Sequence, residues 1–394
     1  IMRVVNPLRS SDTEASIRCS KAFGARVRSE SEEDLVIKGT NGSPRTPEDV
    51  LDCGNSGTTL RLFTGEAALC NGITVLTGDE SLRSRPNGPL LDALNSLGVE
   101  ASSTRYDGCA PLVVEGPLEG GATSIDGSVS SQFISSLLFA APLTTRGIEL
   151  NIKNELRSRP YVDITLDVLE RTGIEYEETD KGFGVEGNQS YECDEFRVPG
   201  DFSSASYLLA AGAIAGDGRV EVSNLFPSAQ GDSIIIGVLK DMGAEVEWDE
   251  DGGVVRIRKG NLRGTEFDAS DNPDLVPTIA VLGAVAEGKT RIINAEHLRY
   301  KETDRLEAMA TELAKMNAEV EQGDDYLIID GSSSDLKGAN VSGWHDHRVV
   351  MSLAIAALAA EGETVIDTAE SVNVSYPEFT DSLFSLGGNI RKVS

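Results

Sequence analysis

A repeated segment constrains the fold of this chain more than any other feature. An amphipathic helix that ends near a glycine is followed by a strand, a polar turn and a second strand, and this segment recurs six times. A register kept over the whole chain is hard to produce by accident and predicts an architecture of similar units. Glycine or asparagine at the end of a helix fits a left-handed C-terminal cap. The helix ends lie 70 to 75 residues apart, at Gly24, Gly98, Gly173, Gly243, Asn317 and Gly387.

A second type of segment lies between these copies. It has a polar start, a helix that is apolar nearly all round, and a strand, and it occupies 54–78, 127–152, 200–225, 270–296 and 344–370. Helices that are apolar on every face are expected inside a domain and not on its surface. The sequence therefore predicts five buried helices.

The numbers of the two segment types do not match. Six copies of the first type stand against five of the second, and only a trailing strand near residues 2–6 precedes the first copy. We therefore expect that an N-terminal segment with a sixth buried helix is missing from this sequence.

The buried helices begin with small, polar or charged residues. Such residues can serve simply as N-caps. Free backbone N–H groups and the helix dipole also make a helix start a place for anions. Because all five starts share the feature, we favour anion binding. The starts are 55–58, 130–132, 203–204, 271–272 and 345–348.

Composition excludes some classes of protein. The net charge is −29 over 394 residues, which argues against nucleic-acid binding, because that affinity comes mainly from Lys and Arg on phosphates. The acidity fits a well-solvated surface or adaptation to high salt, and the sequence leaves both open. The sequence contains no run of 18 apolar residues, so it predicts no membrane span. Five scattered cysteines without a CxxC pair make a disulfide framework or zinc site improbable and favour a reducing cytoplasm.

Five short motifs, laid side by side, carry a specific resemblance. They are Cys53-Gly54-Asn55-Ser56-Gly57-Thr58-Thr59-Leu60-Arg61, Ser84-Arg85-Pro86, Ser130-Ser131-Gln132, Lys301-Glu302-Thr303-Asp304-Arg305 and Asp346-His347-Arg348. In this order the motifs resemble the signature segments of the 5-enolpyruvylshikimate-3-phosphate (EPSP) synthase family, and the match covers essentially the whole chain.

The resemblance implies an α/β protein with the two-domain enolpyruvyl transferase fold. Each domain is expected to hold three βαβαββ-type units with buried parallel helices, an inside-out α/β barrel, closing over a cleft to which the helix starts point. The crossover is expected near Pro199-Gly200. The expected domains are an N-terminal lobe, 1–199, with its first unit truncated, and a C-terminal lobe, 200–394.

The resemblance also implies a reaction, the transfer of the enolpyruvyl (carboxyvinyl) group of phosphoenolpyruvate to the 5-hydroxyl of shikimate 3-phosphate. Phosphate leaves by addition and elimination, in the shikimate pathway to chorismate and aromatic amino acids. The family implies no cofactor, no metal and no partner beyond the two substrates, and we expect a cytoplasmic monomer that binds neither nucleic acid nor membrane.

The matching positions supply candidate site residues. Proton transfer falls to Asp274 and Glu302, with Lys301 beside them, and the sequence does not settle how the two acids divide the work. Such acids need burial and neighbouring charge to tune them. Arginine suits carboxylate and phosphate because its planar fork makes paired hydrogen bonds. The expected phosphoenolpyruvate ligands are Gly57, Arg85, Gln132, Arg305 and Arg348; those for shikimate 3-phosphate are Ser130, Ser131, Gln132, Ser158, Asp274 and Lys301.

The chain departs from the family pattern at two places. The leading Ser-Lys-Ser motif is absent with the expected missing segment, which puts activity of this chain alone in doubt. Some members also have a lysine that contacts phosphoenolpyruvate where Val374 stands, and Arg299 or His347 are candidate replacements.

Three other hypotheses remain to be weighed. The related transferase acting on UDP-N-acetylglucosamine has a reactive cysteine before an Arg-Pro pair, but residues 78–86 contain none. A non-catalytic anion-binding remnant stays open because of the truncated start. A metal site built on His345, Asp346 and His347 is a poor ligand set and is rejected.

Overall fold

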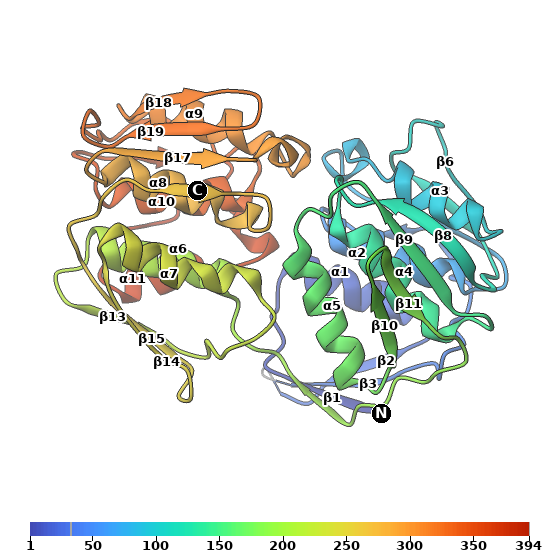
Figure 1. Cartoon of the computed structure of the whole chain (residues 1–394). Coiled ribbons are helices and arrows are strands. Elements are labelled where there is room, and N and C mark those ends of the chain that lie inside the picture. Colours follow the sequence, from blue (N-terminus) through green and yellow to red (C-terminus); the bar gives the residue numbers. More distant parts are fainter. Residues whose placement is uncertain (32–33, 394) are drawn as a thin grey trace. The chain divides into compact units, whose positions relative to one another are not determined.

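The computed structural model describes residues 1–31 and 34–393, which divide into two compact units. Unit 1 is Ile1–Val198 and unit 2 is Pro199–Ser394. Both units combine sheets with two classes of helix, as Figure 1 shows. No helix among the described residues is long and apolar enough to cross a membrane.

Unit 1 contains three four-stranded sheets among its described residues. In each sheet a parallel pair of strands is extended by an antiparallel hairpin. The strand β12, which pairs with β1, was not predicted. In sheet order the strands are β12 (Glu195–Arg197), β1 (Met2–Val5), β3 (Asp34–Lys38) and β2 (Arg26–Ser29); β4 (Leu51–Asp52), β5 (Ile73–Thr77), β7 (Leu112–Glu115) and β6 (Glu100–Ser103); β8 (Gly121–Asp126), β9 (Ile148–Lys153), β11 (Gly182–Val185) and β10 (Tyr176–Thr179).

The helices of unit 1 fall into the two predicted classes. The helices of the first segment type are α1 (Ser11–Ala22), α3 (Gly88–Ser96) and α5 (Arg159–Arg171); those of the second are α2 (Gly57–Ala68) and α4 (Ser131–Ala140). Helix α2 packs directly on α4. Their approach is close at Gly65, where an added Cβ would lie 2.6 Å from the carbonyl oxygen of Ser136. Short 3-10 turns η1 (Leu82–Ser84) and η2 (Ala141–Leu143) complete the unit.

The described residues of unit 2 form sheets of three, four and two strands. They are β13 (Arg219–Val222), β15 (Val254–Arg258) and β14 (Glu245–Asp249); β16 (Glu266–Asp268), β17 (Lys289–Ile293), β19 (Leu327–Asp330) and β18 (Glu319–Gln322); β20 (Asn340–Val341) and β21 (Val365–Ile366).

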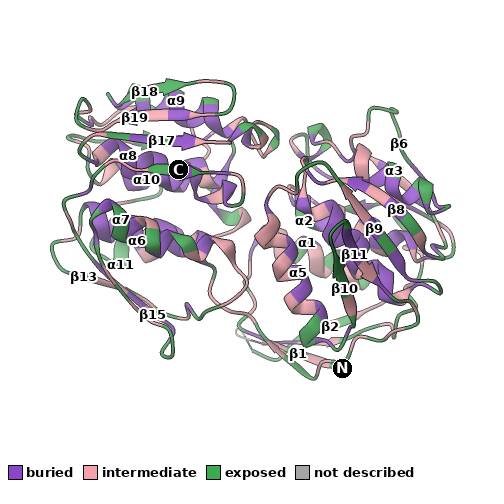
Figure 2. Ribbon diagram, in the orientation of Figure 1, coloured by how far each residue is buried: buried purple, intermediate pink, exposed green. Residues whose placement is uncertain are grey.

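Three helices form the interior of unit 2, and each packs against the other two. These are α6 (Phe202–Ile214), α8 (Val276–Val285) and α10 (His347–Ala357), and they are drawn almost wholly as buried in Figure 2. The outer helices are α7 (Ile235–Met242), α9 (Arg305–Lys315) and α11 (Phe379–Ser385). The 3-10 turns are η3 (Gly231–Ile234), η4 (Pro273–Leu275), η5 (Glu296–Tyr300) and η6 (Ala369–Val374).

The predicted helix ends are confirmed. All six residues have positive φ, from 67° at Asn317 to 111° at Gly24. The five predicted buried helices are also found, and each buries most of its residues. Capping accounts for four of their starts, because Ser56, Ser130, Asp201 and Asp346 accept hydrogen bonds from backbone N–H groups there. At α6 and α10 the capping group is itself a carboxylate, so these two helix dipoles already face a negative charge.

Candidate functional site

In unit 1, four predicted or motif residues converge at the start of α2. Gly57 is the first residue of the helix, after the cap Ser56. A Cβ built on Gly57 would lie 3.1 Å from Nη1 of Arg85, 3.7 Å from Nη1 of Arg61 and 3.9 Å from Oε1 of Gln132. The absence of a side chain therefore leaves this helix start open to the two guanidinium groups.

Arg85 is held in a defined orientation although it is only 5% exposed. Its Nη2 donates to Oδ1 of Asn55 at 3.0 Å and to Oγ of Ser81 at 3.2 Å. Asn55 is oriented in turn by a 2.7 Å bond from its Nδ2 to Asp79. The loop before α2 thus fixes the fork of Arg85, as recognition of a planar anion requires.

Arg61 is the member of this cluster to which the sequence analysis gave no role. Its Nη1 donates to Oε1 of Gln132 at 2.7 Å, and its guanidinium lies over the ring of Phe133 at 5.1 Å. Gln132 donates from Nε2 to Oγ1 of Thr58 at 2.8 Å. The spacing in the sequence could have identified Arg61, because it follows Gly57 by four residues and so lies on the same face of α2.

The serines proposed for shikimate 3-phosphate have different surroundings. Ser130 caps α4 by accepting from the backbone N–H of Gln132 at 3.3 Å, and Ser131 follows it as a buried residue. Ser158 is buried at the start of α5 with a left-handed φ of 56°. Among the described residues, no hydrogen bond of Ser158 joins it to the cluster at α2. The structure thus brings Gly57, Arg85 and Gln132 together and leaves Ser158 at a separate helix start.

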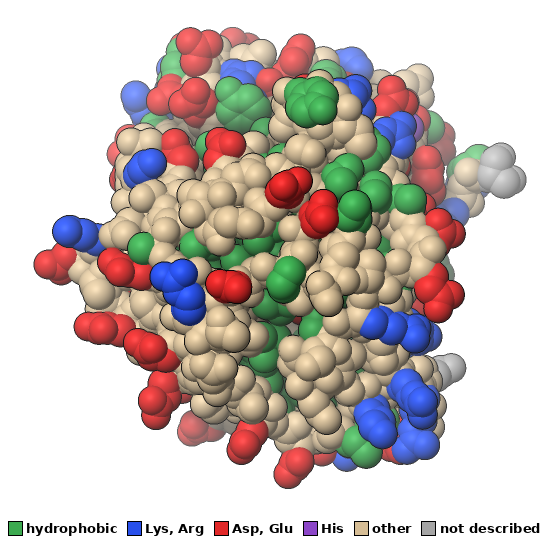
Figure 3. All heavy atoms as spheres, turned by 90° about the vertical axis from the view of Figure 1, so that its right-hand side faces the viewer, with side chains coloured by type: hydrophobic (Ala, Val, Ile, Leu, Met, Phe, Trp, Pro, Cys, Tyr) green, Lys and Arg blue, Asp and Glu red, His purple; other side chains and the backbone are tan. Residues whose placement is uncertain are grey.

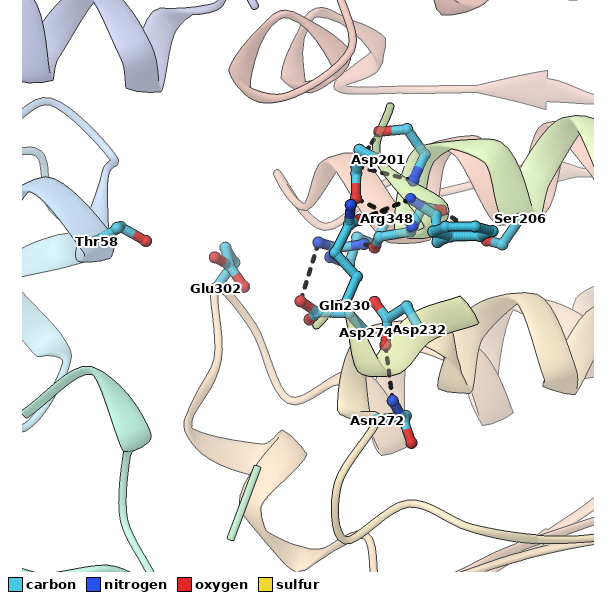
Figure 4. Close-up of polar contacts among 12 residues, drawn as sticks. Thr58, Asp201, Ser206, Gln230, Asp232, Asn272, Asp274, Glu302 and Arg348 are labelled. Carbon is cyan, nitrogen blue, oxygen red and sulfur yellow. Dashed lines mark hydrogen bonds and ion pairs between the residues drawn. The ribbon is translucent and has the colours of Figure 1, made fainter. Parts of the chain in front are cut away.

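In unit 2, Asp274 connects two arginines. Its Oδ1 accepts from Nη1 of Arg305 at 2.8 Å, and its Oδ2 accepts from Nη2 of Arg348 at 3.0 Å. Arg348 also donates to Oγ of Ser203 and, at 3.5 Å, to the hydroxyl of Tyr207. Asp274 of η4 therefore joins Arg305 of α9 to Arg348 of α10, and Figure 4 shows its contact with Arg348.

Arg305 is a buried charge in this cluster, at 1% exposure. Besides Asp274 it binds Glu302, and its Nε donates to Oδ2 of Asp346 at 2.8 Å. Burial alone would lower the pKa of the guanidinium, but the three carboxylates outweigh this and raise the pKa above its ordinary value. Arg305 therefore holds the two proposed proton-transfer acids, Asp274 and Glu302, on one fixed group.

Asp232 is a further acid that the sequence analysis missed. It lies in η3, and its Oδ1 accepts from Nδ2 of Asn272 at 3.1 Å. Burial, together with the charge of nearby Asp274, raises the pKa of Asp232 to about 7. No motif identified it, because only the fold brings η3 to Asn272 and Asp274 (Figure 4).

The proposed substitutes for the family's lysine have other partners. His347 is buried at 6% exposure, and burial lowers its pKa to about 4, so its ring is neutral at neutral pH. Arg299 donates to the carbonyl oxygens of Asp324 and Gly323, at 2.8 and 2.7 Å, and to Asp304, the cap of α9. Arg299 thus anchors the segment that carries Lys301, which is half-buried. His347 therefore supplies no cation in place of the family's lysine. The cation of Arg299 has a structural role.

Comparisons with known proteins identify the family of this chain. The family model for EPSP synthase (3-phosphoshikimate 1-carboxyvinyltransferase) matches residues 2–383. The chain belongs to the EPSP synthase family. A 3-phosphoshikimate 1-carboxyvinyltransferase of Methanococcoides burtonii is 56% identical over 98% of this chain and 90% of the relative. One from Halorubrum lacusprofundi is 52% identical over the same shares.

Solved structures show the same fold as the family match. An EPSP synthase from Acinetobacter baumannii superposes with a TM-score of 0.83 at 26% identity, covering 99% of this chain and 91% of that one. The enolpyruvyl transferase NikO from Streptomyces tendae has a TM-score of 0.77 at 20% identity, covering 99% and 90%, and shows the fold alone. The predicted enolpyruvyl transferase fold is confirmed; the inside-out barrel arrangement stays a prediction.

Proposed function

We propose that this EPSP synthase family member transfers the enolpyruvyl group of phosphoenolpyruvate to the 5-hydroxyl of shikimate 3-phosphate and releases phosphate. The observation that carries the chemistry is the pairing of Asp274 and Glu302 on Arg305. The reaction needs one group to accept the hydroxyl proton and one to serve the methylene carbon, and two acids held on one buried cation suit both tasks.

We assign Asp274 as the base near the hydroxyl and Glu302 as the group serving the methylene carbon, with Lys301 stabilising developing charge. Each oxygen of Asp274 accepts a bond from an arginine, so both oxygens have donors in this structure. An anionic substrate that takes donors from Arg305 and Arg348 would weaken these bonds. The oxygens of Asp274 could then accept the hydrogen bond of the substrate hydroxyl.

Substrate binding is proposed for both sets of residues. Gly57, Arg85, Gln132, Arg305 and Arg348 are assigned to phosphoenolpyruvate; Ser130, Ser131, Gln132, Ser158, Asp274 and Lys301 are assigned to shikimate 3-phosphate. Arg61 joins the first set because it shares Gln132 and the open face of Gly57. Functional lobes of 1–199 and 200–394, a monomeric state and a cytoplasmic location complete the proposal.

Phosphate release measured with both substrates, and with each alone, tests this function. We expect release only with both, together with product detected by NMR. Asp274→Asn and Glu302→Gln keep the side-chain shape and should lower kcat by about 10² to 10⁴. The matched control is Asp335→Asn, which removes an exposed carboxylate that pairs with Lys337 and should change kcat little.

A non-catalytic anion-binding protein would bind shikimate 3-phosphate in calorimetry without releasing phosphate. That result with the unaltered chain would refute the proposed transfer. Equal loss of activity in the Asp335 variant would refute the assignment of the two acids.

A further inference from the structure

The loop that leads into α10 has an unusual backbone. Trp344 and His345 both have φ of 53°, in the left-handed region, and neither is a glycine. Asp346, which binds Arg305 and caps α10, follows directly, and Arg348 is two residues further on. Consecutive left-handed residues persist only where surrounding contacts hold them, and such strain gathers at functional sites.

Glu312 of α9 provides one set of these contacts. Its carboxylate is 1% exposed, and its Oε2 accepts from the backbone N–H of Ser342 at 2.9 Å. Its Oε1 accepts from Nε1 of Trp344 at 2.8 Å. Lys315 donates to both oxygens at 2.8 Å. One buried carboxylate therefore binds the loop through a backbone and a side-chain donor.

The opposite side of the loop is held by the segment after β21. The backbone N–H of Gly343 donates to Asp367 at 2.9 Å, and that of His345 donates to Oγ1 of Thr368 at 3.2 Å. A Cβ on Gly343 would lie 2.3 Å from a methyl carbon of Val350. The loop is thus fixed between Glu312 and residues 367–368, with no room to shift toward α10.

Helix α9 contacts this loop at two points. Arg305, its first residue, binds Asp346, while Glu312, two turns later on the same face, binds Ser342 and Trp344. The distance between the two contacts is set by a rigid helix. A movement of the loop at Trp344 would therefore move Asp346 relative to Arg305.

We propose that Glu312 is a positioning residue of the transfer reaction, which holds the strained loop so that Asp346 and Arg348 face Arg305 and Asp274. This inference rests on the proposed function. Glu312 touches neither substrate in this scheme and acts through the loop. A buried carboxylate is costly to desolvate, and here its bonds to the loop, in addition to Lys315, compensate that cost.

The variant Glu312→Gln keeps the size of the side chain but places an NH₂ group where one loop donor now points. We expect the kcat/KM for phosphoenolpyruvate to fall about 10-fold to 100-fold, because small misplacements of binding groups are costly. The KM for shikimate 3-phosphate should stay within about twofold. The matched control is Lys315→Met, which removes the lysine partner, leaves both loop bonds and should retain near-normal kcat/KM.

The two tryptophans of the chain give a readout that is independent of turnover. In ¹⁵N-tryptophan spectra the indole signal of Trp344 should shift in Glu312→Gln. The signal of Trp248, which donates to the carbonyl oxygen of Leu225 at 2.8 Å, should not. Titrating phosphoenolpyruvate alone, so that no product forms, gives the affinity from the same spectra.

The outcomes separate the inference from the proposed function. If the unaltered chain releases no phosphate, the proposed function is wrong, and the titration still decides the role of Glu312. A weakened phosphoenolpyruvate affinity with a shifted Trp344 signal supports it. Unchanged affinity and kcat/KM in Glu312→Gln would overturn the inference. An equal loss of kcat/KM in Lys315→Met would also overturn it.

Discussion

Replacing Arg305 by methionine tests the energetics of the unit 2 cluster directly. The guanidinium is 1% exposed, and its partner Asp346 is wholly buried. Methionine can fill much of the space of the arginine stem but brings no charge. Asp346 then remains buried without its cation, while Asp274 and Glu302, at 15% and 19% exposure, can rely on water.

The expected cost follows from the difference between these carboxylates. Removing one partner of a buried ion pair costs about 3–5 kcal/mol of unfolding free energy. Asp346 keeps the bond from the backbone N–H of Arg348 at 2.8 Å and the favourable dipole of α10, which places the cost at the lower end. We expect about 3 kcal/mol. With a urea m-value of about 2 kcal/mol/M, the midpoint should fall by about 1.5 M.

Tryptophan fluorescence during urea unfolding measures this change in unit 2 alone. Both tryptophans of the chain, Trp248 and Trp344, belong to that unit. The control Arg391→Met removes an arginine side chain that is 79% exposed, and it should change the unfolding free energy by less than about 0.5 kcal/mol.

A second substitution makes the test sharper. Asp346→Asn keeps an N-cap of equal quality and should destabilise the unaltered protein, since it leaves Arg305 with one carboxylate fewer. In the Arg305→Met background the same change should restore at least about 1 kcal/mol, because it removes the unpaired buried charge. If Arg305→Met costs less than about 0.5 kcal/mol, or if Asp346→Asn destabilises both backgrounds equally, the reasoning is refuted.

Three other predictions concern pH, the start of α2 and salt. The pKa of Asp232, about 7, lies above its ordinary value, so its contribution to stability is present at low pH and lost as pH rises through 7. Asp232→Asn should therefore stabilise unit 2 at pH 8 by up to about 4 kcal/mol, a gain that vanishes near pH 4; an equal gain at both pH values would contradict this. Burial lowers the pKa of His347 to about 4, so stability should fall as the pH is lowered from about 6.5 to 4. The Asp232→Asn variant should show this loss of stability without the contribution of Asp232. Gly57→Ala should raise the KM for phosphoenolpyruvate roughly tenfold by displacing Arg85, whereas the control Gly39→Ala, with open space around it, should not. Raising NaCl from about 0.01 to 1 M should increase the thermal midpoint, because screening weakens repulsion among the charges that give −29; an unchanged midpoint would count against it.

Charged side chains of both signs are interspersed on the face shown in Figure 3. On that face the acidic side chains therefore do not form a single patch. This distribution is the reason to expect a graded response to salt.

The pattern of apolar residues and turn residues determined the architecture of this protein. The spacing of Gly24, Gly98 and their equivalents predicted the helix ends, because only residues that tolerate positive φ can end a helix in that way. The apolar character of α8 and α10 predicted their burial for an equally local reason. Short motifs identified the family, and the spacing of Gly57 and Arg61 was sufficient to place both on one helix face.

Only the tertiary structure decided which charges meet. Arg305 and Asp346 are 41 residues apart, and Arg348 and Asp274 are 74 apart, so no local rule pairs them. The burial of Asp232 beside Asn272, and the two bonds of Glu312 to the loop before α10, depend on packing between distant elements. Local propensity acts over a few residues of the chain, whereas desolvation and pairing of charge depend on every group that packing brings within a few ångströms.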